Sequence, residues 1–167
     1  DRGTSGLLMV ARTQVAYDSL VAQLAGRSVD RRYRTVVWGH LESPRGVVDA
    51  PIGRSPKHPT KMAVTEKGKP ARTQYEVQAA FHDPVVVSEL VCRLETGRTH
   101  QIRVHLSAIG HPVVGDERYR GVRQSLACPR PYLHAELLGF DHPVSGEHLE
   151  FTSALPADLA KVRAGLR

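Results

Sequence analysis

Alternation of polar and apolar side chains in two neighbouring segments constrains the fold of this chain most. Over residues 72–79, Arg, Gln, Glu and Gln occupy the even positions, and Thr, Tyr, Val and Ala occupy the odd ones. A period of two is that of a strand with one buried face. A second run, residues 85–94, follows after a short break, and we expect Val86 and Leu90 to point inward and Glu89 outward. Strands this close in sequence favour an antiparallel sheet.

Further strands and three short helices are expected elsewhere. The expected strands are residues 4–11, 31–40, 132–140 and 148–152, and the expected helices run from Thr13 to about Ala25, from Thr99 to Ile109 and from about Pro156 to Leu166. Thr13 and Gly26 are typical of a helix start and stop. Because strands outnumber helices and several are adjacent, the sequence predicts an α+β fold with a mixed, mostly antiparallel sheet and flanking helices.

Charge points to a polyanionic partner. The formal net charge is +6, and residues 54–72 hold six basic side chains against one acid, Glu66. Three prolines and a glycine lie in the same segment, so we expect a loop or a loose hairpin. A basic loop of this kind suits contact with nucleic acid phosphates, although a solvated basic surface would carry the same composition.

Length and cysteine content suggest the setting. With 167 residues the chain has the size of one domain, and no apolar run is long enough to span a membrane. Cys92 and Cys128 form no CxxC pair, so we expect reduced thiols and a cytoplasmic protein, with a secreted protein that has one disulfide as the less favoured alternative. A monomer is the default expectation.

Three polar groupings are candidates for chemistry. Asp1 precedes an apolar run, where a carboxylate suits nucleophilic or electrostatic catalysis, but taken alone the residue is more typical of an ordinary exposed aspartate. Polar side chains crowd the turn and first helical residues over 97–105, where free backbone N–H groups favour anions. Tyr33, flanked by arginines, suits stacking on a base, although a half-buried strand tyrosine is more common. His100 and His105 lack the spacing and the cysteines of a zinc site, and no metal is expected.

Together these segments resemble the RluA/RluD family of pseudouridine synthases. The resemblance covers nearly the whole sequence. It rests on Asp1-Arg2-Gly3-Thr4-Ser5-Gly6-Leu7, Arg32-Tyr33, Gly68-Lys69-Pro70, Gly97-Arg98-Thr99-His100-Gln101-Ile102-Arg103, Gly110-His111-Pro112-Val113-Val114-Gly115-Asp116, Tyr132-Leu133-His134-Ala135 and His142-Pro143. The Gly-Arg-Thr-His-Gln block, followed at the right distance by Gly-His-Pro and Gly-Asp, is highly specific.

The resemblance implies the pseudouridine synthase catalytic fold with a central active-site cleft, and isomerisation of uridine to pseudouridine in RNA without a cofactor. Asp1 matches the catalytic aspartate, Tyr33 the base-stacking tyrosine and Arg103 the arginine that pairs with the aspartate. Leu133 falls where the family places an apolar side chain against the flipped uracil. The substrate-binding residues expected beside Arg103 are Arg98, His100 and Gln101.

The family pattern is not complete in this chain. Family members carry His-Arg-Leu before the aspartate and many carry an N-terminal S4 domain, whereas here the sequence starts at Asp1. We therefore expect residues 1–167 to be a catalytic domain that is incomplete at its N-terminus, with no S4 domain. Large-subunit ribosomal RNA is favoured as substrate, with transfer RNA as the alternative. A non-catalytic RNA-binding or ribosome-assembly module of the same fold is the alternative function, and a hydrolase is disfavoured because no nucleophile elbow is present.

Overall fold

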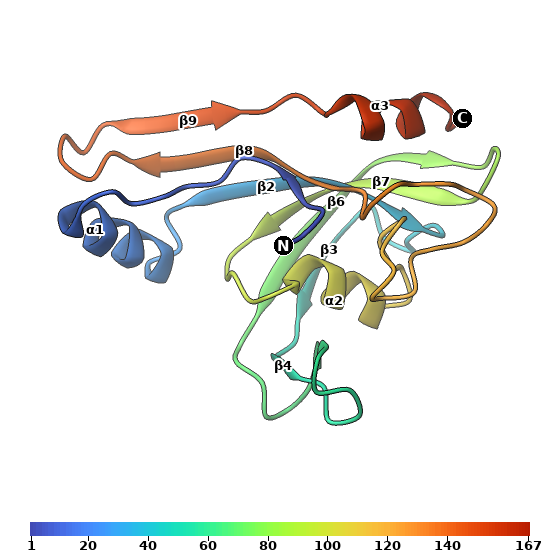
Figure 1. The fold of residues 1–167 in the computed structure, drawn as a ribbon, viewed down its shortest axis with the longest axis horizontal. Coiled ribbons are helices and arrows are strands. Elements are labelled where there is room, and N and C mark those ends of the chain that lie inside the picture. The colour runs from blue at the N-terminus through green and yellow to red at the C-terminus, as the bar shows by residue number, and fades with distance from the viewer.

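One large mixed sheet forms the body of the protein (Figure 1). The computed structural model describes residues 1–167. The strand order is β1-β8-β2-β7-β6-β3, and β9 also pairs with β8. The strands are β1 (Ser5–Gly6), β2 (Asp30–Trp38), β3 (Arg45–Asp49), β6 (Arg72–Phe81), β7 (Val87–Leu94), β8 (Leu133–Asp141) and β9 (His148–Thr152). Only β1 runs parallel to its neighbour, so the expected α+β fold with a mostly antiparallel sheet is confirmed.

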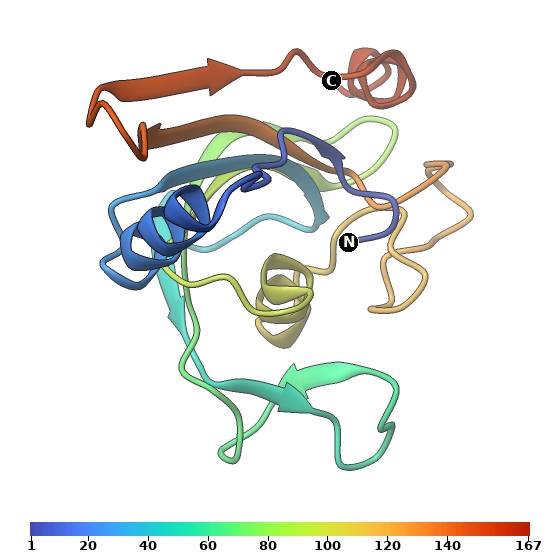
Figure 2. The same ribbon diagram turned by 60° about the vertical axis from the view of Figure 1, so that its left-hand side comes forward.

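A small hairpin, β4 (Ile52–Arg54) with β5 (Met62–Val64), projects from the sheet at the side away from β9 (Figures 1 and 2). It occupies the basic segment for which a loop or loose hairpin was expected. Its pairing covers three register positions, and the turn between the strands has exposed basic side chains such as Lys57. The hairpin therefore presents charge to solvent while it stays attached to the domain.

Three helices accompany the sheet: α1 (Gln14–Ala25), α2 (Gln101–Ala108) and α3 (Ala157–Ala164). The expected capping of α1 is confirmed, because Thr13 Oγ1 accepts a hydrogen bond from the Ala16 amide. Helix α2 begins later than expected. His100, in a left-handed conformation (φ 58°), takes the N-cap position, one residue after the expected helix start at Thr99. None of the helices is long and apolar enough to cross a membrane.

The main core lies between the strands of the large sheet and the elements that cover it. Sixteen buried residues form it, and Leu90 and Cys92 of β7 are fully buried as the alternation predicts. The prediction for two neighbours was wrong: Val86 is 49% exposed and Glu89 only 3%. Val86 precedes the strand. Glu89 can be buried because the guanidinium groups of Arg34 (3.3 Å) and Arg163 (2.8 Å) pair with its two oxygens.

The expected strand over residues 4–11 is also wrong for most of its length. Only Ser5 and Gly6 pair with β8, and Leu8 and Val10 are exposed. The physical reason is competition for one strand edge, because β9 pairs with the same side of β8 from Leu137 onward. The short pairing of β1 with β8 still holds the preceding turn, residues 1–4, against the sheet.

Candidate active site

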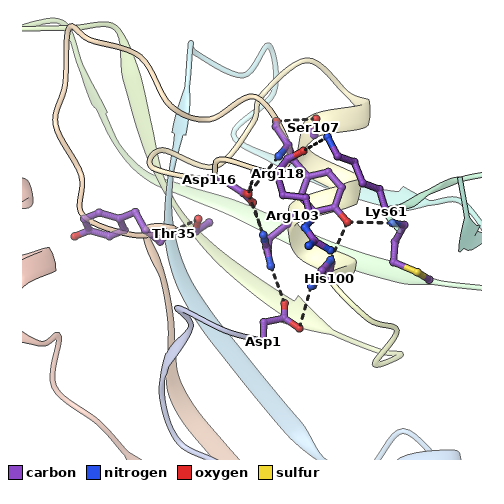
Figure 3. Close-up of polar contacts among 11 residues, drawn as sticks. Asp1, Thr35, Lys61, His100, Arg103, Ser107, Asp116 and Arg118 are labelled. Atoms are coloured by element: carbon purple, nitrogen blue, oxygen red, sulfur yellow. Dashed lines mark hydrogen bonds and ion pairs between the residues drawn. The ribbon is translucent and has the colours of Figure 1, made fainter. Parts of the chain in front are cut away.

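Asp1 lies beside α2, and its carboxylate faces two side chains of that helix and its cap (Figure 3). Asp1 Oδ2 is 3.5 Å from Arg103 Nη1, and Asp1 Oδ1 is 3.9 Å from His100 Nε2. A turn holds the residue in place, since the Thr4 amide donates to the Asp1 carbonyl oxygen at 3.2 Å. The side chain keeps 24% of its surface exposed, so the carboxylate is oriented and still accessible.

Arg103 is held more firmly by a second carboxylate, that of Asp116. Arg103 Nε and Nη2 donate to its two oxygens at 2.6 and 2.9 Å, and both side chains are buried. A bidentate pair of this kind fixes the plane of the guanidinium group. The Arg103 guanidinium also lies over the Tyr119 ring, 5.2 Å from its centre. The remaining nitrogen, Nη1, is thereby directed at Asp1.

The structure thus brings Asp1 and Arg103 together, as the resemblance implied. Asp116 was not expected to take part, although Gly115-Asp116 belongs to the matched motifs. The only sequence feature that could have indicated a role for Asp116 is its charge. A fully buried acid requires a cation, and Arg103 on the preceding helix is available.

His100 is a neutral imidazole in this environment. Burial, and after it the positive charges of Arg103 and Arg118, lower its pKa from 6.5 to about 4. His100 Nδ1 lies 2.8 Å from the Tyr119 hydroxyl, which accepts a hydrogen bond from the Met62 amide at 3.3 Å. The arrangement that uses every proton has the Tyr119 hydroxyl donate to Nδ1. The imidazole proton is then on Nε2, the atom that faces Asp1.

A pocket of about 250 Å³ opens beside Asp1. Its lining residues are Asp1, Thr4, Arg31, Tyr33, Leu94, Gly97, Arg98, Gln101, Ile102 and Leu133. Five residues expected at the site from the sequence are therefore neighbours: Asp1, Tyr33, Arg98, Gln101 and Leu133. The other two, His100 and Arg103, line a second cavity of about 570 Å³ that also includes Arg2 and Arg130. Asp1 lies at the boundary, since it contacts residues of both.

Tyr33 and Leu133 form walls of the smaller pocket. Tyr33 comes from β2, and Leu133, which is 3% exposed, comes from the start of the neighbouring strand β8. Burial raises the pKa of the Tyr33 phenol, and the positive charge of Arg31 offsets part of this rise. The phenol is therefore protonated near neutral pH. A flat aromatic ring beside aliphatic side chains can hold a planar heterocycle.

Gln101 has no free hydrogen-bonding group to offer a substrate. Its amide oxygen accepts from the Thr96 hydroxyl and the Arg98 amide, at 2.7 and 3.0 Å. Its amide nitrogen donates to the Arg72 carbonyl and the Thr73 hydroxyl, at 2.9 and 3.0 Å. The geometry gives Gln101 the task of fixing the turn before α2. Arg98 is different, because its side chain is partly exposed at the pocket and Nε donates only to a backbone carbonyl, that of Pro70.

The basic hairpin is attached to the loop that carries Asp116 (Figure 3). Lys61 Nζ donates to the Arg118 carbonyl at 3.1 Å, and Arg118 Nη1 donates to the Thr60 carbonyl at 3.1 Å. The Met62 amide donates to the Tyr119 hydroxyl, as described above. These bonds hold the positively charged hairpin against the loop that carries Asp116. No group of three or more His, Cys, Asp and Glu side chains is placed to hold a metal ion.

Fold and site together define an α+β domain with an accessible carboxylate, a pocket for a planar ring and a basic surface beside it. Residues 1–108 match the model of the family described as RNA pseudouridylate synthase, and the chain belongs to this family. It is 48% identical over its whole length to the ribosomal large subunit pseudouridine synthase D of Nitrosomonas europaea, of which it covers 49%. It is equally similar, at 48%, to the uncharacterized RNA pseudouridine synthase YlyB of Bacillus subtilis, of which it covers 54%.

A solved structure agrees with these sequence comparisons. The human RNA pseudouridylate synthase domain containing 1 superimposes with a TM-score of 0.82 and 32% identity, over 99% of this chain and 70% of the human chain. The chain spans about half the length of the curated relatives it matches.

Proposed function

We propose that this protein isomerises specific uridines of RNA to pseudouridine, and that the RNA is large-subunit ribosomal RNA. The observation that carries the reaction is the Asp1 carboxylate, directed by Arg103 at the edge of a pocket that Tyr33 and Leu133 shape for a planar base. The choice of RNA is supported by the relatives at 44–48% identity that are named ribosomal large subunit pseudouridine synthase D.

The reaction rearranges atoms already present in the uridine. The N1–C1′ bond breaks and its electron pair leaves with the uracil. Asp1 either attacks C1′ to form an ester or removes the C2′ proton to form a glycal. The detached base turns until C5 faces C1′, and the C5–C1′ bond forms. On the ester route the bond between C1′ and the Asp1 oxygen breaks in this step, and on the glycal route Asp1 returns its proton to C2′. C5 then loses its proton and N1 gains one, so the sum of atoms and electrons is unchanged.

Each step makes a demand that a residue of the site can meet. A base stacked in RNA cannot reach Asp1, so the nucleotide has to flip into the pocket. Tyr33 would then stack on the uracil and Leu133 would pack against the base. Arg103 holds Asp1 in position, and its own position is fixed by Asp116. The hairpin and Arg98 supply positive charge for the flanking phosphates.

The test is to map pseudouridine in RNA treated with the protein. Transcripts of large-subunit ribosomal RNA and of transfer RNA are incubated with wild type and with Asp1→Asn, and modified positions are found by carbodiimide adducts and primer extension. We expect modification at defined uridines of ribosomal RNA with wild type and none with Asp1→Asn. Asp18→Asn, which removes an exposed carboxylate on α1, is the matched control and keeps activity.

Two other results would change the proposal. Modification confined to transfer RNA would keep the reaction and replace the substrate. If wild type binds both RNAs and modifies neither, while Asp1→Asn binds as well, the protein is an RNA-binding module and the catalytic proposal is wrong.

A further inference from the structure

Arg31 is the arginine of the large sheet that has no carboxylate partner. The other sheet arginines all pair with acids: Arg32 and Arg93 with Asp30, Arg34 with Glu89 and Glu136, Arg45 with Glu76, and Arg72 with Asp49 and Glu95. Arg31 is also distinguished by the face it occupies. It lines the Asp1 pocket with Tyr33, two residues along β2, whereas Arg32 and Arg34 line a groove on the opposite face.

Most of the donors of Arg31 are unused. Nη2 donates to the Leu94 carbonyl oxygen at 3.2 Å, and Nε is buried with no partner. Burial lowers the pKa of this guanidinium, as expected for a cation that nothing nearby neutralises. Thr4, at the same pocket, has a buried hydroxyl without a partner. Unsatisfied buried polar groups are rare and costly, and two at one pocket indicate that a ligand completes them.

The strand register places Arg31 and Asp1 at opposite ends of the pocket. Ser5 pairs with His134, which lies opposite Arg34 of β2, so the turn carrying Asp1 meets the sheet at that end of β2. Arg31 pairs with Leu138, further along β8. Tyr33 therefore lies between the two ends. A nucleotide with its ribose at Asp1 and its base on Tyr33 directs the base edge farthest from the ribose toward Arg31.

The ligand of Arg31 has to be an acceptor that tolerates a carboxylate in the same pocket. A phosphate would be repelled by Asp1, whereas the carbonyl oxygens of uracil are neutral. The edge of uracil farthest from the ribose carries O4, an acceptor, and cytosine has an amino group there, which is a donor. A guanidinium group offers only hydrogen-bond donors, so it can bind O4 of uracil but has no favourable contact with the amino group of cytosine.

We propose that Arg31 donates a hydrogen bond to O4 of the flipped uracil and thereby selects uridine over cytidine. The identification of the ligand rests on the proposed function. The turn of the base gives this contact a second use. Rotation that exchanges N1 with C5 also exchanges C2 with C4, so O2 takes the position that O4 leaves. Arg31 then meets a carbonyl oxygen before and after the rotation and keeps the detached base in the pocket.

The test is base preference in binding, which requires no turnover. Fluorescein-labelled oligo(U) and oligo(C) of equal length are titrated with the protein, and affinities are measured by fluorescence anisotropy. A hydrogen bond to a charged group predicts that wild type binds oligo(U) at least about tenfold more tightly. Arg31→Gln should bind both equally, because an amide can donate to O4 or accept from the cytosine amino group. Arg31→Met should lose affinity for oligo(U) alone.

Arg32→Met is the matched control. It removes the same charge one residue away on the other face, so any loss of affinity should be equal for the two oligonucleotides and the preference should remain. The proposal is overturned if wild type shows no preference, or if Arg31→Met weakens both complexes equally, as removal of a phosphate-binding group would.

Two further readouts separate failure of this proposal from other failures. If melting curves show that the Gln and Met variants do not fold, Arg31→Lys, which keeps a cation and donors, has to retain the uracil preference, and its loss refutes the contact. If the protein forms pseudouridine but its preference for oligo(U) does not depend on Arg31, the Arg31 proposal alone is wrong. If the preference for oligo(U) is lost only in Arg31 variants and no pseudouridine is formed at any site, the proposed function alone is wrong.

Discussion

Arg103 contacts two carboxylates, and the structure predicts opposite consequences when each is converted to an amide. Asp116 is fully buried and its oxygens accept four hydrogen bonds, two from Arg103 and two from the backbone amides of Arg118 and Tyr119. Asp1 is 24% exposed and has one contact with Arg103, at 3.5 Å. Asp116→Asn and Asp1→Asn therefore remove the same charge from the same arginine in different surroundings.

The expected magnitudes follow from burial. Removing one partner of a buried ion pair costs about 3–5 kcal/mol, because the other charge stays buried. In a domain of this size about 1 kcal/mol corresponds to roughly 2–4 °C, so Asp116→Asn should lower the melting temperature by roughly 6–20 °C. A partly exposed pair contributes about 0–1 kcal/mol, so Asp1→Asn should lower it by no more than about 4 °C.

Thermal unfolding followed by circular dichroism measures both values, and primer extension on treated RNA measures activity at a temperature where both variants are folded. Asp1→Asn should be stable and inactive. Asp116→Asn should be unstable, with residual activity, because Arg103 still faces Asp1. Equal losses of melting temperature, or a loss below about 4 °C for Asp116→Asn, would refute the view that Asp116 is the structural partner of Arg103.

Three further measurements test other parts of the structure. Because the pKa of His100 is about 4 in the folded protein and 6.5 is the ordinary value, the unfolded chain binds the extra proton as pH falls between these values. Wild type should lose stability over this range relative to His100→Gln, and parallel melting temperatures of the two from pH 7 to pH 4 would contradict the burial of a neutral imidazole. Lys57→Gln in the hairpin turn together with Lys67→Gln in the loop after β5 should reduce the salt dependence of RNA binding, by about 0.7 in the log–log slope for each phosphate that the protein no longer neutralises. An unchanged slope would exclude this basic segment from the RNA interface. Burial raises the pKa of the Cys92 thiol to about 12, so this cysteine should react with iodoacetamide only after unfolding, and rapid native labelling would argue against its place in the core.

Periodicity was sufficient to predict the parts of the fold that depend on local pattern. The strands β6 and β7 and the helix that Thr13 caps follow from side-chain alternation and end signals. Periodicity failed where a distant partner decides the outcome. Glu89 is polar and would be placed outside by its pattern, yet two arginines from β2 and α3 make its burial possible.

The candidate site was predictable to a similar degree. The family motifs indicated Asp1, Tyr33 and Arg103, and the structure places Tyr33 and Asp1 at one pocket and Arg103 beside Asp1. The Arg103–Asp116 pair joins a helix to a loop 13 residues later, a separation with no periodic signal. Arg31 and Arg32 are the same residue type at adjacent positions, so the sequence alone does not distinguish their roles. Only the face of the strand, and the acids available on that face, separate the two.

The two arginines of the site illustrate how a carboxylate partner decides what a buried cation can do. Arg103 has Asp116, which offsets its charge, fixes its plane and leaves one nitrogen to hold Asp1. Arg31 has no such partner, and apart from the bond from Nη2 to the Leu94 carbonyl its donors remain free for a ligand. An acid placed beside Arg31 would occupy those donors and repel Asp1, and loss of the acid beside Arg103 would leave Asp1 as its only anion. The distribution of acids around the pocket therefore separates the residue that positions the aspartate from the one that we infer reads the base.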